Sequence, residues 1–240
     1  MKSALRVLFP GIVWWPVLLI PLVALAFYAS YFSRLLSATA LLHVHFSVLM
    51  VWVVLLIVQP FLILRNNLTA HRIAGRTSYF IIPAVVLTTW LVIARTAGTL
   101  MESNAEPSTF EKQAIFIPMI FLLWLVVLYV LAIVFRHRYV HHATYMFSSA
   151  LTLLGPTLDR ILFQIYKYYN VGFNVLAEFF TFAVIDAILL ALLFYQFKKR
   201  YSLTAVIVSI VIYLAGQTAY VFLPSSEGWE DLLRALFARS

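Results

Sequence analysis

The chain has 240 residues, of which 64% are hydrophobic and 11% are charged, and its formal net charge is +8. Soluble domains carry about 25% charged residues, and a water-soluble fold of this size has too little interior to bury so much apolar side chain. The composition excludes a water-soluble globular protein, and the absence of cysteine excludes disulfides, thiolate nucleophiles and cysteine-ligated metal centres.

Seven apolar stretches are long enough to cross a bilayer as helices, because one crossing takes about 20 residues. They cover residues 12–32, 41–64, 77–97, 114–135, 144–165, 174–197 and 203–223. The runs lack the alternation of apolar and polar residues that is typical of membrane β-strands. The sequence therefore predicts an all-α bundle of seven transmembrane helices that forms a single domain over residues 1–240.

The first stretch follows two basic residues, Lys2 and Arg6. Within it, residues 24–26 match the small-x-small pattern of a signal-peptidase site. The apolar run continues beyond that point to Tyr31. We therefore interpret residues 12–32 as an uncleaved first helix, with a cleaved signal peptide as the alternative.

The second stretch carries two histidines near its start, His43 and His45. Residues two apart on a helix point about 200° away from each other, so only one of the two can face the interior. His45, Trp52 and Gln59 are spaced by seven residues and line one face of the helix. We therefore expect His45 to be the inward-facing histidine.

Histidines and arginines flank the start of the third stretch and fill the connection between the fourth and fifth. Two histidines on different helices can ligate a b-type haem, and arginines can hold its propionates. The alternative is that these are ordinary basic loops, which also bind anionic lipid head groups. The predicted cofactor-binding residues are His71, His141, His142, Arg72 and Arg76.

A polar stripe with steps of three and four residues runs along the fifth stretch. Lipid cannot satisfy such a stripe, so it must face other helices or a water-filled cavity. In a structural interpretation, the stripe only joins helices. In a functional interpretation, it lines a cavity or a proton path. Its members are His142, Tyr145, Ser149, Thr152, Pro156 and Asp159.

Ionisable residues gather near one end of several stretches. His45, Asp159 and Glu178 are expected within about 10 Å of the same membrane boundary, given the helical rise of 1.5 Å per residue. Imidazole and carboxylate groups of this kind bind zinc or iron. The alternative is a set of buried salt bridges with Arg95 and Arg160. The predicted metal ligands are His45, Asp159, Glu178 and His43.

The C-terminal segment 226–240 is amphipathic. Trp229, Leu232, Leu233 and Leu236 share one helical face with Phe237. Such a helix either lies in the membrane–water interface or packs on the bundle.

Basic residues indicate the orientation of the bundle. If the N-terminus is inside, most lysines and arginines fall in inner segments and the acids outside the membrane fall in outer ones, as the positive-inside rule requires. The sequence therefore predicts an inner N-terminus and an outer C-terminus, and it explains the positive charge without a nucleic-acid partner. The outer acids are Glu102, Glu106, Glu111, Glu227, Glu230 and Asp231.

Two motifs resemble those of a family of bacterial multi-pass membrane proteins of unknown function. The first runs from His43-Val-His45 through Gln59-Pro60 to His71-Arg72-x-x-Gly75-Arg76, and the second from His141-His142 to Arg160. The resemblance covers roughly residues 40–165 and implies a bacterial inner (cytoplasmic) membrane location. The family's histidine-bearing helices are distantly similar to cytochrome b561-type bundles, although the fourth stretch here has no histidine.

Three functions fit these patterns. The first is a membrane redox protein that binds haem b or a divalent metal, with a quinone or lipid-like ligand as a partner. The second is a metal-dependent membrane hydrolase or hydroxylase that uses the His/carboxylate cluster. The third is a non-enzymatic carrier, assembly or lipid-binding protein. The sequence has no phosphate-binding glycine loop, nucleophile elbow or His-Glu-x-x-His motif that would single out another enzyme class.

Overall fold

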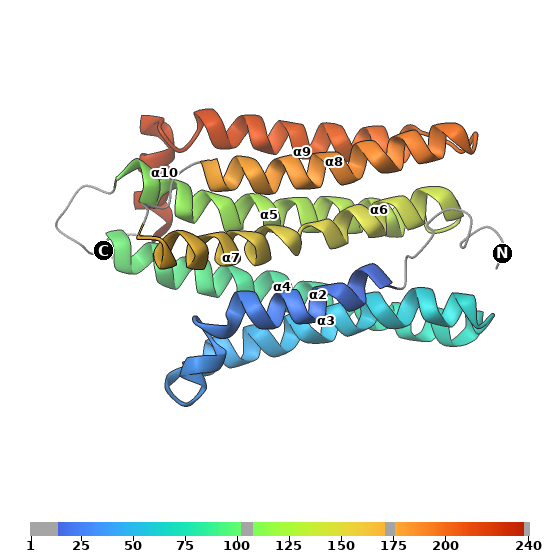
Figure 1. The fold of residues 1–240 in the computed structure, drawn as a ribbon, viewed down its shortest axis with the longest axis horizontal. Coiled ribbons are helices and arrows are strands. Elements are labelled where there is room, and N and C mark those ends of the chain that lie inside the picture. Colours follow the sequence, from blue (N-terminus) through green and yellow to red (C-terminus); the bar gives the residue numbers. More distant parts are fainter. Residues whose placement is uncertain (1–13, 102–107, 171–175, 238–240) are drawn as a thin grey trace. The chain divides into compact units, whose positions relative to one another are not determined.

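The computed structural model describes residues 14–101, 108–170 and 176–237, and all regular structure in these ranges is helical (Figure 1). The helices are α2 (Trp14–Tyr28), the 3-10 helix η1 (Phe32–Ser37), α3 (Ala40–Leu64), α4 (Leu68–Met101), α5 (Thr109–Val134), α6 (Tyr139–Leu151), α7 (Leu154–Tyr168), α8 (Leu176–Lys198), α9 (Thr204–Phe222) and α10 (Glu227–Phe237). Lys2, Arg6, Glu102 and Glu106, which contribute to the predicted orientation, lie outside the described residues, as do the last three residues of the predicted tail.

Five helices, α3, α4, α5, α8 and α9, are long and apolar enough to cross a membrane. They coincide with five of the seven predicted spans. The first predicted span appears as the shorter apolar helix α2. The fifth, over residues 144–165, differs from the expected single helix, because it is divided between α6 and α7.

The chain divides into two compact units, residues 1–88 and 89–240, with the boundary inside α4. In the first unit, α2 packs against η1 and α3. The chain then reverses at residues 65–67, and the first part of α4 runs back along α3. Two contacts at opposite ends of this pair set its register: His45 bonds to Thr88, and Gly75 lies beside the amide of Gln59.

The reversal after α3 is built from its asparagines. Asn66 has a left-handed backbone with φ of 59°, which asparagine tolerates better than most residues. The N–H groups of Asn66 and Asn67 donate to the carbonyls of Ile63 and Leu62, which closes the end of α3. The side chain of Asn67 then accepts from the N–H of Ala70 and caps the start of α4.

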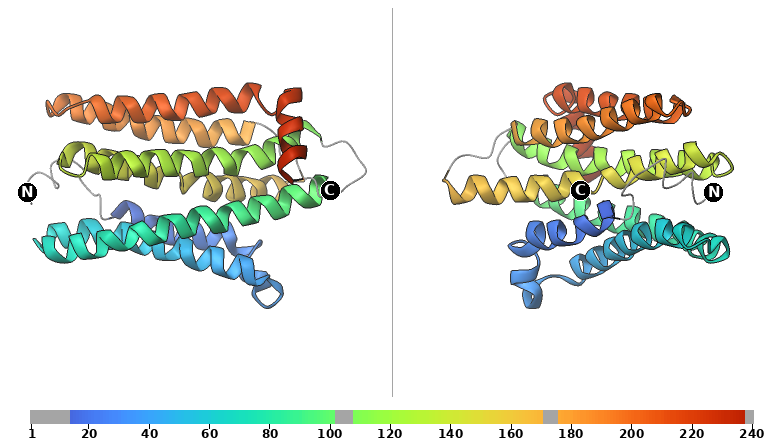
Figure 2. Two further views of the ribbon diagram at one scale, coloured as in Figure 1. Left: turned by 180° about the vertical axis from the view of Figure 1, so that it is seen from behind. Right: turned by 45° about the vertical axis from the view of Figure 1, so that its right-hand side comes forward.

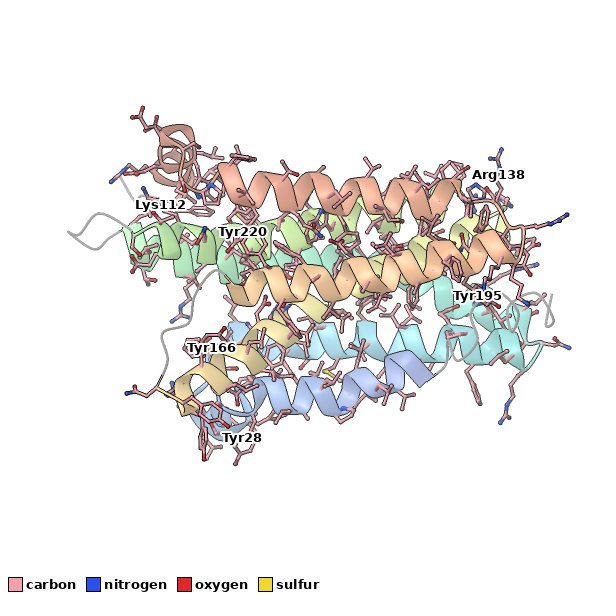
Figure 3. The ribbon with its side chains drawn as sticks, turned by 45° about the horizontal axis from the view of Figure 1, so that its top comes forward. Tyr28, Lys112, Arg138, Tyr166, Tyr195 and Tyr220 are labelled. Atoms are coloured by element: carbon pink, nitrogen blue, oxygen red, sulfur yellow. The ribbon has the colours of Figure 1, made fainter. Side chains whose placement is uncertain are left out.

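In the second unit, α5, the α6–α7 pair, α8 and α9 run alternately up and down (Figures 1 and 2). α6 packs against α5 and α9, α7 packs against α8, and α9 also packs against α5 and α8. α10 lies across the end of this bundle rather than along it. Figure 3 shows Lys112 and Tyr220 toward that end, with Arg138 and Tyr195 at the opposite end.

The break between α6 and α7 falls at Thr152 and Leu153, just before Gly155 and Pro156. Proline has no N–H, and its ring clashes with the carbonyl four residues earlier, so a continuous helix is disfavoured here. The last carbonyls of α6 find other donors. The backbone carbonyl of Ser148 accepts from the hydroxyl of Tyr213 at 2.8 Å, and the backbone carbonyl of Ser149 accepts from the hydroxyl of Thr152 at 2.7 Å. The break is therefore compatible with an apolar environment.

Candidate functional site

Two acidic side chains from neighbouring helices meet in the second unit. The carboxyl groups of Asp159 on α7 and Glu178 on α8 lie close enough to interact electrostatically. The hydroxyl of Thr181 donates to Oδ1 of Asp159 at 2.7 Å. Glu178 is 8% exposed, and its Oε2 atom is buried without a hydrogen-bond partner. We call Asp159 and Glu178 the carboxyl pair.

A direct hydrogen bond between two carboxyl groups requires a proton on one of them, because ionised carboxylates only accept. Two negative charges in contact inside an apolar bundle would also repel each other strongly. Burial and mutual repulsion therefore favour a carboxyl pair that shares one proton. The neighbouring Arg160 adds a positive charge beside Asp159, and its Nη1 donates to the carbonyl of Pro156 at 2.8 Å.

Tyr220 on α9 connects the carboxyl pair to a cluster of rings. It is 1% exposed and interacts electrostatically with both acids. The ring centroids of Phe182 and Tyr220 are 5.4 Å apart, those of Trp124 and Phe182 are 6.1 Å apart, and those of Trp124 and Tyr213 are 4.5 Å apart. We call these four rings together with Phe121 the aromatic layer.

Two glycines allow the aromatic layer to fit between the helices. A Cβ atom on Gly155 of α7 would lie 2.1 Å from Cζ of Phe121, and one on Gly216 of α9 would lie 2.5 Å from Cζ2 of Trp124. The indole of Trp124 also donates to the carbonyl of Ile212 at 3.0 Å. On both α7 and α9, a glycine therefore provides the space that an aromatic ring of α5 occupies.

A second polar group lies toward the other end of the unit. The Nε2 atom of Gln196 on α8 donates to the hydroxyl of Thr144 on α6 at 2.8 Å. Ser148 lies one turn further along α6, and all three side chains are 0% exposed. We call Thr144, Ser148 and Gln196 the inner polar site, after the side of the membrane on which the sequence predicts them to lie.

The predicted polar stripe faces the helices of its own unit. Tyr145, Ser149 and Thr152 are almost completely buried, and α6 packs on α5 and α9. A further acid, Asp186 on α8, accepts from Nε2 of Gln217 on α9 at 2.9 Å. Polar contacts thus join the helices of the second unit at several depths.

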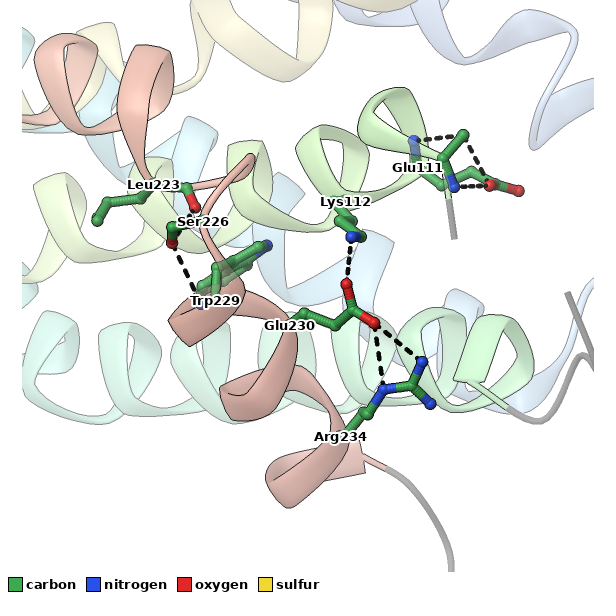
Figure 4. A network of polar contacts seen from close by, with 8 residues as sticks. Glu111, Lys112, Leu223, Ser226, Trp229, Glu230 and Arg234 are labelled. Atoms are coloured by element: carbon green, nitrogen blue, oxygen red, sulfur yellow. Dashed lines mark hydrogen bonds and ion pairs between the residues drawn. The ribbon is translucent and has the colours of Figure 1, made fainter. Parts of the chain in front are cut away.

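α10 packs on the bundle through its apolar face, at the end where Tyr220 lies. Trp229, Leu233 and Phe237 are buried, whereas Leu232 and Leu236 are about half exposed. The ring of Trp229 contacts Phe116, whose ring in turn lies 6.3 Å from that of Tyr220. Figure 4 shows the polar side of this contact, where Glu230 is paired with Lys112 of α5 and with Arg234.

The two histidines near the start of α3 have partners within the first unit. His43 shares a hydrogen bond of 2.8 Å with the hydroxyl of Tyr31. The hydroxyl of Thr88 donates to the carbonyl of Ala84, so Nδ1 of His45 donates to Thr88 at 3.2 Å. Trp52 is 0% exposed and the amide of Gln59 is buried, so the predicted His45 face is packed.

The structure brings Asp159 and Glu178 together, but these acids belong to the second unit and His43 and His45 to the first. Within the residues that the structure describes, no group of three or more histidines and acids could hold a metal ion. Metal ligation by His43, His45, Asp159 and Glu178 stays a prediction. Arg95, expected as an ion partner of these acids, is exposed on α4.

The residues of the predicted haem site are also divided between the units. The first unit contains His71, Arg72 and Arg76, and the second contains His141 and His142. Nδ1 of His142 donates to the carbonyl of Ala132 at 2.8 Å, and the ring of His141 stacks on Phe135. Partial burial and the charge of Arg138 lower the pKa of His141. The predicted haem site is therefore neither assembled nor excluded.

Several residues of the site had no place in the sequence predictions. Thr181 and Tyr220 beside the carboxyl pair are single polar or aromatic residues in apolar stretches. Gln196 could have been found from its spacing, because 18 residues are five helical turns and place it on the same face of α8 as Glu178. No sequence pattern paired it with Thr144.

Comparison with protein-family models, with curated proteins and with solved structures gives no match for this chain.

Proposed function

We propose that this protein is a membrane carrier that moves protons across the bilayer and uses the carboxyl pair as its proton-binding site. The observation that carries the proposal is the close approach of Asp159 and Glu178, which come from packed helices of an apolar bundle. Acids inside transmembrane bundles are costly and typically belong to ion or proton pathways. This function differs from the non-enzymatic carrier suggested by the sequence, in which the ionisable clusters had a structural role only.

The surroundings of the carboxyl pair support reversible proton binding. Thr181 donates to Asp159 and stabilises negative charge there, whereas the buried Oε2 of Glu178 has no donor. A carboxylate with a donor ionises more easily than one without. We assign the proton to Glu178 and the charge to Asp159, with Arg160 as a nearby counter-ion.

The proposal includes a topology with seven crossings. α2 and the α6–α7 pair each form one crossing, in addition to the five long apolar helices. Arg138 and Lys199 then lie on the inner side, and Lys112 and Glu230 on the outer side, in agreement with the positive-inside rule. We further propose a bacterial cytoplasmic membrane as the location, on the resemblance described above.

A haem-binding redox protein is the second candidate, and one observation favours it. The hydrogen bond from Nδ1 of His142 to a backbone carbonyl fixes the tautomer that presents Nε2, as metal-ligating histidines do. In the sequence prediction, His71 is the second ligand. Purified protein expressed with haem supply would show a Soret band that is lost in His142→Ala, and a colourless protein would exclude this function.

The experiment that tests the carrier function is a proton-flux assay in reconstituted vesicles that contain a trapped pH-sensitive dye. A potassium diffusion potential set with valinomycin drives protons inward. The wild-type protein should acidify the vesicles faster than empty vesicles do. Asp159→Asn and Glu178→Gln should each lower the rate by about a hundredfold, which is typical for loss of a positioned proton-transfer group.

The matched control is Asp231→Asn, which removes an exposed acid from α10 and should leave the flux unchanged. Thermal unfolding in detergent checks that all three variants are folded. Wild-type vesicles no faster than empty ones, or carboxyl-pair variants as fast as the wild type, would refute the proposed function.

A further inference from the structure

The inner polar site contains two oxygen atoms that lack a hydrogen bond. The amide of Gln196 donates through Nε2, but its Oε1 is buried without a partner. The hydroxyl Oγ of Ser148 is also buried without a partner. Both side chains are 0% exposed. The carbonyl of Ser148, by contrast, is satisfied by Tyr213.

Such atoms are expensive in an apolar bundle. A buried polar group without a partner keeps the full penalty of its lost hydration, and the penalty is higher where lipid surrounds the protein. Proteins commonly resolve it with an internal water molecule that bonds to two or more polar groups. Thr144 and Ser148 are one helical turn apart, so their side chains are neighbours on α6. Gln196, bonded to Thr144, therefore brings its free oxygen to the same region.

We infer that the inner polar site binds an internal water molecule between Ser148 and Gln196, and that this water exchanges protons with the inner face. The inference rests on the proposed carrier function for its role, but the water site itself rests only on the unpaired oxygens. The water accepts one proton on one side as it releases another, so it is unchanged after each transfer. The ligand of this site is water, and no metal or organic cofactor is required.

An apolar segment separates this water from the carboxyl pair. Glu178 and Gln196 lie on one face of α8, roughly 27 Å apart along its axis. Phe182, Ile185 and Leu189 lie on the same face between them and are 3% exposed or less. Asp186, bonded to Gln217, lies at an intermediate depth on a neighbouring face of α8. The face of α8 that joins the two polar sites is therefore apolar between them.

Because the chain has no cysteine, a single introduced thiol can report on water contact. In Ser148→Cys, the S–H stretching band in the infrared should shift to S–D within the mixing time after transfer to D₂O. In the matched control Ile185→Cys, on the fully buried apolar face of α8, the S–H band should persist. A thiol in Ser148→Cys that exchanges as slowly as the one in Ile185→Cys would overturn the inference.

A second variant tests the role of the amide. Adding Gln196→Leu to Ser148→Cys should slow thiol exchange by about tenfold or more, the factor expected for loss of one hydrogen bond to the water. Unchanged exchange would contradict the assignment of Gln196. If Asp159→Asn and Glu178→Gln leave the proton flux unchanged, the carrier function is refuted and the water site is not. If the thiol of Ser148→Cys does not exchange while the proton flux is normal, the water site is refuted and the carrier function is not.

Discussion

At the scale of single residues, the aromatic layer depends on the absence of a side chain at Gly155 and Gly216. The rings of Phe121 and Trp124 occupy the space where their side chains would be, and both rings are almost completely buried. Because both rings are buried against these glycines, each glycine affects how closely its helix approaches α5. A membrane bundle gains little from the hydrophobic effect between helices and relies on such close packing.

Replacing either glycine with alanine should destabilise the protein. Gly155→Ala or Gly216→Ala would overlap with Phe121 or Trp124 and should cost about 1–3 kcal/mol, measured as a lower melting temperature in detergent. Gly228→Ala on α10 is the control, because nothing lies within 4 Å of its added Cβ. A melting temperature unchanged in all three variants would show that the rings do not sit on these glycines.

Helical periodicity in the sequence predicted some of the buried residues. Trp52 and the middle of the polar stripe, Tyr145 to Thr152, are buried, whereas His43 and His45 are both half-buried. Periodicity assigns residues to a face, but it does not say which helix lies opposite. The bond between Thr144 and Gln196 therefore could not be predicted, since it joins residues 52 positions apart.

At the scale of elements, hydropathy was enough to locate five spans, because length and apolar composition are all that a crossing needs. It did not locate the α6–α7 break. The Gly155-Pro156 pair is a sequence signal for such a break, but the surrounding residues are apolar enough to read as one span. The break also depends on Tyr213, which supplies a donor from α9.

α10 is held to the bundle mainly by its apolar side chains. Leu233 is 0% exposed, so Leu233→Ala should cost about 2–5 kcal/mol. The ion pair of Glu230 with Lys112 is partly exposed, so Glu230→Ala should cost at most about 1 kcal/mol. The rate at which a protease removes the C-terminal helix measures both effects.

The control for α10 is Leu232→Ala, because Leu232 is 45% exposed and should have little effect on cleavage. Cleavage that is faster in Glu230→Ala than in Leu233→Ala would reverse this ranking and would make the ion pair the main attachment.

At the scale of the whole molecule, the proposed topology makes a prediction of its own. Ser202 precedes α9 and should be inside, whereas Ser225 follows α9 and should be outside; both are exposed. In cells whose outer membrane is permeabilised and whose cytoplasmic membrane is intact, a membrane-impermeant thiol reagent should label Ser225→Cys and not Ser202→Cys. The absence of native cysteine removes background labelling. The opposite pattern would invert the orientation, and equal labelling would contradict a crossing by α9.

The central claim is that Asp159 and Glu178 share one proton inside the bundle. Infrared difference spectroscopy across a pH titration measures this directly, because a protonated carboxyl has its own C=O stretching band. The wild-type protein should show a band that disappears as the pH rises, that is absent in Glu178→Gln and shifted in frequency in Asp159→Asn, and that is unchanged in Asp231→Asn. A band that persists unchanged in both carboxyl-pair variants would contradict the account.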